Sequence, residues 1–444
     1  MQDDLFPAAE RILADLEAAF RKDPKLKEFD IVPVTVNNNK SPVLHVEHSL
    51  GLESWCVRHV YCYTYHRLMD ARQLRSRRED PAMLARLLSG ALLLNPDVTT
   101  FWNMRRELML ADRLDVQGEL HFTTVLLSRK PKCAEAFAHR KWVIGRLLLA
   151  GADKEELLEE ELQVSQYAAD RYPNNYHAWS HRMWCVTHLA PSATVPLFKE
   201  WTTSEQWVSS HVSDHSGMQY RQFLLDRLLK LTHPACEDIA ESGTRSLQQL
   251  LSSSKAIHVS CSQDGDTTHN LKTSAFSRPL GLIASELLLN MELILRFAGH
   301  EALWCHRRYL LMSFKKHLSC REIDVNGTEG SRFSKVSVVK TCCAEKEVSL
   351  SSCATGSAAH GGKANNHMNT DGVPLEKDQK LSSEELSNLY RDVHCHLLGA
   401  VMWHEAKLIN SCRPDEPHQQ RLAKQHHKWL SHVLKLDMTA VTNP

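Results

Sequence analysis

The stretch YPNNYHAWSHRMW, residues 172–184, decides the fold because it places Trp179 three positions before Arg182. The same spacing of an aromatic residue and an arginine recurs along the chain, with a degenerate copy at Met218 and Arg221. The other copies are Trp102 with Arg105, Phe137 with Arg140, and Trp304 with Arg307. Successive arginines lie 35, 42 and 39 residues apart, and the last interval, 86, is about twice the others. A period of this size is typical of stacked helical hairpins.

Each repeat is predicted to be a pair of helices. In residues 81–110, apolar residues recur at helical spacing until Asn95 and Pro96 stop the first helix, and a second helix follows. Trp102 and Arg105 share one face of this second helix. The indole can fill the groove between helices, and the guanidinium can donate to unpaired carbonyls at neighbouring helix ends. We therefore interpret the recurring pairs as structural.

The repeats predict an all-α fold, a right-handed superhelix of helical hairpins similar to a tetratricopeptide solenoid. Residues 1–80 form an N-terminal helical cap, and residues 81–231 hold repeats one to four. The first helices of these repeats are predicted at 81–94, 114–129, 153–171 and 195–211, and the second helices at 99–110, 134–149, 177–190 and 215–231. A further repeat spans 280–318, and C-terminal helices span 382–437, with KQHHKWL (424–430) as a faint last repeat.

Two segments lack the apolar residues that a hairpin needs. The insert at 232–279 is rich in serine and threonine, above all from residue 241 onward, and no tryptophan or tyrosine occurs in the insert at 319–381. Such composition buries too little apolar surface to offset the entropy of ordering a chain. We expect both inserts to be disordered.

The overall composition excludes several classes of protein. The 53 basic and 53 acidic residues balance, which argues against nucleic acid as the main partner. No apolar run has the length of a membrane span, and the start of the chain is acidic and amphipathic, unlike a signal peptide. The 13 cysteines contain no CxxC pair, so neither a disulfide framework nor a zinc ribbon is expected. We expect a soluble, cytoplasmic protein.

Three histidines stand directly before a repeat arginine: His139, His181 and His306. A metal site would need them to converge, but they belong to different repeats, separated by 42 and 125 residues. We expect them to line one ridge of the array and to contact a neighbour, as candidates for a subunit interface. No metal site is predicted.

Asp214, His215 and Ser216 bring the residue types of a hydrolytic triad together. Neighbours in sequence cannot form the relay in which the acid orients the histidine and the histidine deprotonates the serine. Ser213 or Asp214 is better interpreted as the cap of the helix that begins near His215. The sequence therefore predicts no catalytic residue in this chain.

The stretch from Tyr172 to Arg182 resembles the repeat P-x-N-Y-x-x-W-x-x-R of protein prenyltransferase alpha subunits. Residues 95–105, 131–140 and 299–307 are similar but looser, and the resemblance covers about 81–231 and 280–318. It implies a crescent of hairpins that wraps a beta subunit folded as an alpha-alpha barrel, and it implies that this beta subunit holds the catalytic zinc and the geranylgeranyl diphosphate. It implies no cofactor in this chain.

The resemblance also points to three positions near the diphosphate. In the farnesyl and type I geranylgeranyl enzymes, a lysine two residues before the repeat tyrosine faces the diphosphate, and the matching residue here is Asn174. Tyr176 matches the tyrosine, and His215 takes the equivalent place in the next repeat. An amide cannot supply the charge of an ammonium group, so we expect no direct catalytic role for these three positions.

The leading hypothesis is the non-catalytic alpha subunit of a heterodimeric protein geranylgeranyltransferase. The resemblance implies a beta subunit shared with the Rab enzyme, and protein substrates with a C-terminal cysteine. One alternative is a helical-repeat adaptor without enzymatic role, which the missing lysine at Asn174 favours. Another is a standalone hydrolase acting through His215. The sequence does not identify the acceptor protein or choose between farnesyl and geranylgeranyl donors.

Overall fold

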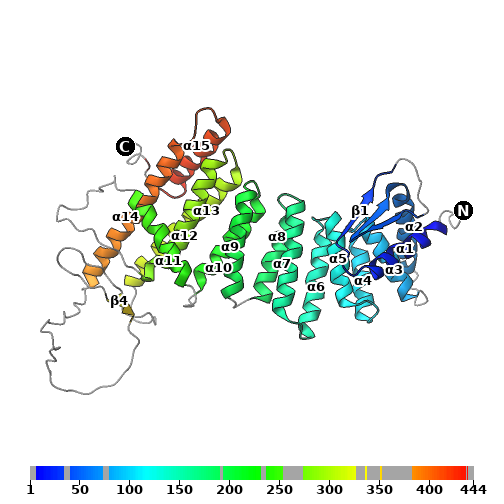
Figure 1. Cartoon of the computed structure of the whole chain (residues 1–444). Helices are drawn as coiled ribbons and strands as arrows, with labels where there is room; N and C mark the ends of the chain where they lie inside the picture. Colours follow the sequence, from blue (N-terminus) through cyan, green and yellow to red (C-terminus); the bar gives the residue numbers. More distant parts are fainter. Residues whose placement is uncertain are drawn as a thin grey trace, which may run out of the picture. The chain divides into compact units, whose positions relative to one another are not determined.

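The computed structural model describes residues 7–34, 41–73, 80–190, 194–231, 237–253, 274–326, 336–337, 351–352, 383–436 and 438. It consists mainly of consecutive paired helices and a small N-terminal sheet (Figure 1). The predicted helical-hairpin fold is thus confirmed, and the sheet is an addition to it. The chain divides into two compact units, residues 1–204 with 214–223, and residues 205–213 with 224–444.

The N-terminal region combines two helices with three strands. Helices α1 (Pro7–Lys22) and α2 (Ser54–Gln73) match the predicted cap. Between them lie β1 (Glu28–Val32), β2 (Val43–Val46) and β3 (Ser49–Glu53). The order in the sheet is β1-β3-β2, with β1 parallel and β2 antiparallel to β3. The prediction of a helical cap, with an extended stretch at residues 31–42, did not include this sheet.

The sheet forms because short strands bury alternate apolar side chains. Phe29 of β1 and Leu50 of β3 pair in register, and both are almost fully buried, as is Leu52. The sheet is bonded to the repeats that follow, because the Phe29 amide of β1 donates to the Ser128 hydroxyl at 3.0 Å. The cap is thus joined to the helices that follow.

Residues 81–230 form four hairpins whose bounds lie within two residues of the prediction. The first helices are α3 (Pro81–Leu94), α5 (Val116–Arg129), α7 (Lys154–Arg171) and α9 (Thr194–Ser210). The second helices are α4 (Thr99–Leu110), α6 (Ala134–Leu149), α8 (Tyr176–Leu189) and α10 (His215–Lys230). Figure 1 shows α3 to α8 packed side by side, from cyan to green.

Local capping explains why these helices begin where they do. Carboxylates of Asp80, Asp115 and Asp153 accept hydrogen bonds from backbone amides in the first turns of α3, α5 and α7. Asn175 does the same for α8. The repeat thus places a short polar side chain before each of these helices.

The second unit contains one helix that the sequence interpretation missed. Its helices are α11 (Glu237–Ser253), α12 (Ser274–Arg296), α13 (Glu301–Asn326), α14 (Ser383–Asn410) and α15 (Pro417–His432). Helix α11 lies in the insert predicted to be disordered, and Leu247 and Leu250 are buried there. A Cβ atom on Gly281 of α12 would lie 2.6 Å from the carbonyl carbon of Gly243, so the two glycines allow close packing of α11 and α12. Residues 254–273 of this insert lie outside the described residues.

The second insert is described only in part. Helix α13 continues to Asn326, beyond the predicted end of the repeat at 318. Two short strands, β4 (Val336–Ser337) and β5 (Ser351–Ser352), pair antiparallel. The prediction of disorder at 327–335, 338–350 and 353–382 falls outside the described residues. Across the described part of the chain, no helix combines the length and hydropathy needed to cross a bilayer.

Candidate functional site

Each repeat arginine is buried between two hairpins and connects them, as Arg140 shows. Its Nε donates to Glu161 of the next hairpin at 3.0 Å, and its Nη2 also donates to that carboxylate. Its Nη1 donates to the Leu120 carbonyl at 2.6 Å and to the Thr123 hydroxyl at 2.8 Å in its own hairpin. Arg140 is 2% exposed and Glu161 is 0% exposed. One guanidinium thus donates to acceptors in both hairpins.

The same arrangement recurs at the other repeats. The pairs with the next first helix are Arg105 with Glu119, Arg182 with Glu200, and Arg307 with Glu405, at Nε to oxygen distances of 2.9, 2.7 and 3.0 Å. The degenerate copy keeps the contact within its own hairpin, since Arg221 Nη1 donates to the Trp201 carbonyl at 2.7 Å and to the Ser204 hydroxyl at 3.0 Å.

The residue before the repeat arginine, or before its equivalent His427 in the last repeat, completes the connection in every copy except the first, where Met104 stands. His181 Nε2 lies 2.6 Å from Glu161, so this carboxylate receives Arg140 from one hairpin and His181 from the next. The equivalent pairs are His139 with Glu119 at 3.0 Å, His306 with Glu286 at 2.9 Å, and His426 with Glu405 at 2.8 Å. In the remaining case the Tyr220 hydroxyl donates to Glu200. We call each set of arginine, glutamate and histidine or tyrosine a buried junction.

The aromatic residues of the repeat pack against these junctions. Trp102 lies on His139 of the following hairpin, with ring centroids 4.9 Å apart. The corresponding pairs are Phe137 with His181, Trp179 with Tyr220, and Trp304 with His426, at 5.1, 5.0 and 5.2 Å. Both members of the repeat motif therefore bind one hairpin to the next.

These contacts correct two expectations. His139, His181 and His306 do contact a neighbouring helix, but they are at most 2% exposed and so cannot present a ridge to another subunit. The arginines donate mainly to glutamates and to carbonyls inside the first helices, such as that of Leu120, and not to carbonyls at helix ends. A buried carboxylate compensates the arginine charge, which a neutral carbonyl alone could not do.

Sequence interpretation missed the glutamates of the junctions, although a signal for them exists. Glu119, Glu161, Glu200 and Glu286 each stand 20 residues before the histidine or tyrosine that contacts them. The last repeat has 21 residues between Glu405 and His426. This nearly constant spacing within a hairpin could have identified all five.

Electrostatics fix the protonation states inside the junctions. Burial by itself would raise the pKa of Glu161, but the Arg140 charge and the hydrogen bond from His181 outweigh it and lower the pKa to about 2. The pKa values of Glu119 and Glu405 are likewise lowered to about 2. Burial lowers the pKa of the partner histidines, His139, His181 and His426. A neutral histidine must then carry its proton on Nε2 to donate to the carboxylate.

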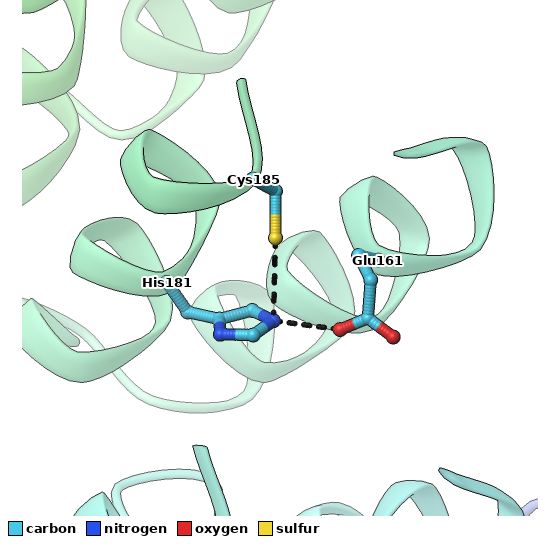
Figure 2. A group of neighbouring side chains, drawn as sticks. All are labelled: Glu161, His181 and Cys185. Atoms are coloured by element: carbon cyan, nitrogen blue, oxygen red, sulfur yellow. Dashed lines mark hydrogen bonds and ion pairs between the residues drawn. The ribbon is translucent and has the colours of Figure 1, made fainter. Parts of the chain in front are cut away.

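Glu161, His181 and Cys185 form a compact group of possible metal ligands (Figure 2). The Cys185 sulfur lies 3.4 Å from His181 Nε2. Burial raises the pKa of the Cys185 thiol, which keeps it protonated, and Arg140 already occupies Glu161 with two donors. A cation would be placed beside a guanidinium, so this group fits a buried junction better than a metal site.

The positions implied by the resemblance lie together on an exposed surface. The Asn174 side-chain oxygen accepts a hydrogen bond from the His215 backbone amide at 2.8 Å, and the Asn174 backbone amide donates to the Asp214 carboxylate at 2.7 Å. Asn174 has a φ of 53°, a left-handed conformation that asparagine tolerates. Tyr176 is 56% exposed, and its amide donates to the Asn174 carbonyl. Asn174 therefore positions the start of α10 and brings its neighbours Tyr176 and His215 near one another.

The sequence of Asp214, His215 and Ser216 does not form a relay. One Asp214 oxygen accepts from the Gly217 amide at 2.8 Å, as the capping interpretation predicted. The other accepts from Asn174. One carboxylate oxygen thus holds an amide at the start of α10 and the other holds an amide just before α8, so the hydrolase hypothesis loses its acid.

Comparison with known proteins agrees with this architecture. The family model "Protein prenyltransferase alpha subunit repeat" matches residues 116–147, 158–189 and 283–314, each of which is one hairpin. A geranylgeranyl transferase type-2 subunit alpha of Sus scrofa is 32% identical over 154 residues, which cover 32% of this chain and 25% of that protein.

Several relatives match almost the whole chain. Protein prenyltransferase alpha subunit repeat-containing protein 1 of Danio rerio is 30% identical over 98% of this chain and 99% of its own length. Protein 1-A of the same name from Xenopus laevis is 32% identical over 95% of this chain and 96% of its own length. The chain therefore belongs to the family of protein prenyltransferase alpha subunit repeat-containing proteins.

Proposed function

We propose that this chain is the non-catalytic alpha-type subunit of a heterodimeric protein geranylgeranyltransferase. The proposal is carried by the observation that the buried junctions occupy the polar side chains of the repeats. The polar groups that could have formed an active site, above all the histidines and glutamates, are instead paired between hairpins. Such a chain is a scaffold, and the chemistry belongs to its partner.

The proposed partner is a beta-type subunit, the one that serves the type-2 enzyme. The 154-residue similarity to a geranylgeranyl transferase type-2 subunit alpha supports this choice. In the reaction, a thiolate at the C-terminal cysteine of a protein substrate attacks C1 of geranylgeranyl diphosphate, a C–S bond forms and diphosphate leaves. The zinc that lowers the pKa of the thiol would be bound by the partner. A cytoplasmic location is part of the proposal.

Co-expression tests the subunit assignment. The chain would be co-expressed with the type-2 beta subunit of the same organism and purified through a tag on one of the two subunits. The molar mass of the product would then be measured by light scattering. The proposal predicts a complex of one chain each that transfers radiolabelled geranylgeranyl to a protein ending in cysteine. Separate elution of the two chains, or a complex without transfer, would refute it.

An adaptor without enzymatic role is the second candidate, and one observation favours it. Asn174 replaces the lysine expected near a diphosphate, and its amide oxygen is already occupied by the His215 amide. Tyr176→Ala distinguishes the candidates, because Tyr176 is exposed and its side chain does not hold α10. A subunit near the diphosphate predicts a several-fold slower transfer, on the scale of one lost hydrogen bond. An adaptor predicts unchanged kinetics.

A further inference from the structure

A second series of aromatic residues lies outside the buried junctions. These residues stand two positions after a repeat arginine, or after its equivalent His427 in the last repeat, and are partly exposed: Trp142, Trp184, Phe223, Tyr309 and Trp429. The first copy has Glu107 at this position. Trp142 stacks on His139 with centroids 6.0 Å apart, and Trp184 stacks on His181 at 6.1 Å. The junctions therefore hold these outer rings in fixed orientations, which lowers the entropy cost of binding through them.

Cations surround the first two of these rings. The guanidinium carbons of Arg106 and Arg146 each lie 5.8 Å from the Trp142 centroid, and the Lys141 nitrogen lies 5.8 Å from that of Trp184. Among the described residues, Lys141 and Arg146 form no ion pair with a carboxylate. These residues come from the adjacent second helices α4, α6 and α8.

Charge is segregated between the first and second helices. Helix α8 contains no acidic residue, and α6 contains only Glu135, in its first turn. The first helix α7 between them in sequence carries exposed acidic residues: Glu155, Glu156, Glu159 and Glu160. Helices α6 and α8 therefore present a basic and aromatic surface, and its tryptophans and arginine are residue types enriched in protein interfaces.

Gly145 in the interior of α6 gives an independent indication. Glycine is less favourable than alanine inside a helix, and it usually serves close packing. Here an added Cβ would meet nothing within 4 Å, so packing within the chain does not require a glycine. Gly145 lies three residues after Trp142 and next to Arg146, and Leu149, one turn on, is 88% exposed. An approaching polypeptide would explain both the missing side chain and the exposed leucine.

We infer that Arg106, Lys141, Trp142, Gly145, Arg146 and Trp184, here called the second-helix face, form the docking surface for the beta-type partner, which meets it with an acidic surface. The inference rests on the proposed function and specifies where and by which charge the partner binds. A nucleic acid would also suit cations and aromatic rings, but the chain has no net positive charge and carries acidic residues on α7.

Titration calorimetry with the type-2 beta subunit tests the charge. The double variant Lys141→Glu/Arg146→Glu should bind more than about tenfold more weakly, and the difference should shrink as salt is raised. The matched control is Glu156→Lys/Glu159→Lys on α7, which changes as many charges and should leave the affinity within about threefold. Equal weakening by both variants would overturn the inference.

A steric pair tests the place without changing charge. Gly145→Gln adds a side chain to the face, whereas Gly145→Ala adds only a Cβ, which would meet nothing within 4 Å in the free chain. Gly145→Gln should weaken binding more than about tenfold relative to Gly145→Ala, because a side chain in a close contact displaces the partner. Circular dichroism of both variants checks that the fold is kept.

The outcomes separate the two proposals. If the unaltered chain does not bind the beta subunit, the proposed function fails and the inference fails with it. If the unaltered chain binds and the charge and steric variants bind equally well, the proposed function stands and the inference alone is overturned. The inference would also be overturned if the charge variant lost binding to a single-stranded RNA while its binding to the beta subunit stayed unchanged.

Discussion

Arg140 and Lys141 are neighbours in α6 and carry the same charge, but they belong to two different regions. Arg140 lies in a buried junction and binds Glu161, while Lys141 lies on the second-helix face beside Trp184. The arginine recurs in all five copies of the aromatic and arginine motif, whereas the next residue changes from copy to copy, through Arg106, Lys141, Met183, Gln222 and Arg308. The difference teaches that repetition marks the residues that hold hairpins together. Positions whose residue differs between repeats are candidates for contact with a specific partner.

Removal of one junction carboxylate should have the largest effect on stability. Glu161→Gln leaves the Arg140 charge buried without its counter-ion, and we expect a loss of about 3–5 kcal/mol in the free energy of unfolding. Urea denaturation followed by circular dichroism measures it. The exposed Glu159→Gln is the matched control and should stay within about 0.5 kcal/mol. Equal losses would show that the junction does not stabilise the fold.

Acid should destabilise the junctions in two steps. The folded pKa values of His139, His181 and His426 are lowered, so the unfolded chain takes up protons first, and stability falls as the pH drops below about 6.5. The pKa values of Glu119, Glu161 and Glu405 are about 2 in the folded chain. Protonation of each carboxylate should therefore lower the free energy of unfolding by about 1 kcal/mol between pH 7 and pH 4, and by more below pH 4.

Denaturation midpoints measured from pH 7.5 to pH 4 check this expectation. The junction account predicts a continuous decline that begins near the ordinary pKa of histidine. Glu161→Gln should show a shallower decline than the unaltered chain. Stability that is constant down to pH 4 would contradict the assigned protonation states.

The tyrosine junction offers a smaller and more specific test. Tyr220→Phe removes the hydroxyl that donates to Glu200 and should cost about 1–2 kcal/mol, since Arg182 still pairs the carboxylate. Tyr220→His restores the histidine of the other repeats and should recover part of the loss. Thermal unfolding of both variants provides the comparison. If Tyr220→His were less stable than Tyr220→Phe, the histidine and tyrosine junctions would not be interchangeable.

The second-helix face should behave in the opposite way. Gly145→Ala should raise the free energy of unfolding by about 0.5–1 kcal/mol, because alanine is the better helix former and no neighbour obstructs its Cβ. The gain would show that glycine is costly to the free chain. A loss of stability would indicate that Gly145 serves packing within the chain.

Sequence alone predicted the hairpins closely but only half of each junction. Helical spacing and caps are local, so the bounds of α3 to α10 followed from pattern. The Arg–Glu pairs are not local, because Arg105 precedes Glu119 by 14 residues and Arg140 precedes Glu161 by 21. No fixed interval indicates them. The spacing of 20 residues between glutamate and histidine is the signal that was overlooked.

Other misses have different physical causes. Helix α11 depends on contact with α12 through Gly243 and Gly281, which composition does not reveal. The N-terminal sheet depends on the pairing of β1 with a strand about 20 residues later. At the candidate site, repeat equivalence placed Tyr176 and His215 at equivalent positions, but it could not show that the Asn174 side chain holds the His215 amide.

Hydrogen–deuterium exchange of the chain with and without the type-2 beta subunit tests the central claim most directly. The account predicts added protection in peptides from α4, α6 and α8, where the second-helix face lies, and little change in α7. Protection concentrated on α7, or no protection anywhere at saturating partner, would contradict the claim that the junctions hold a scaffold whose second helices bind the partner.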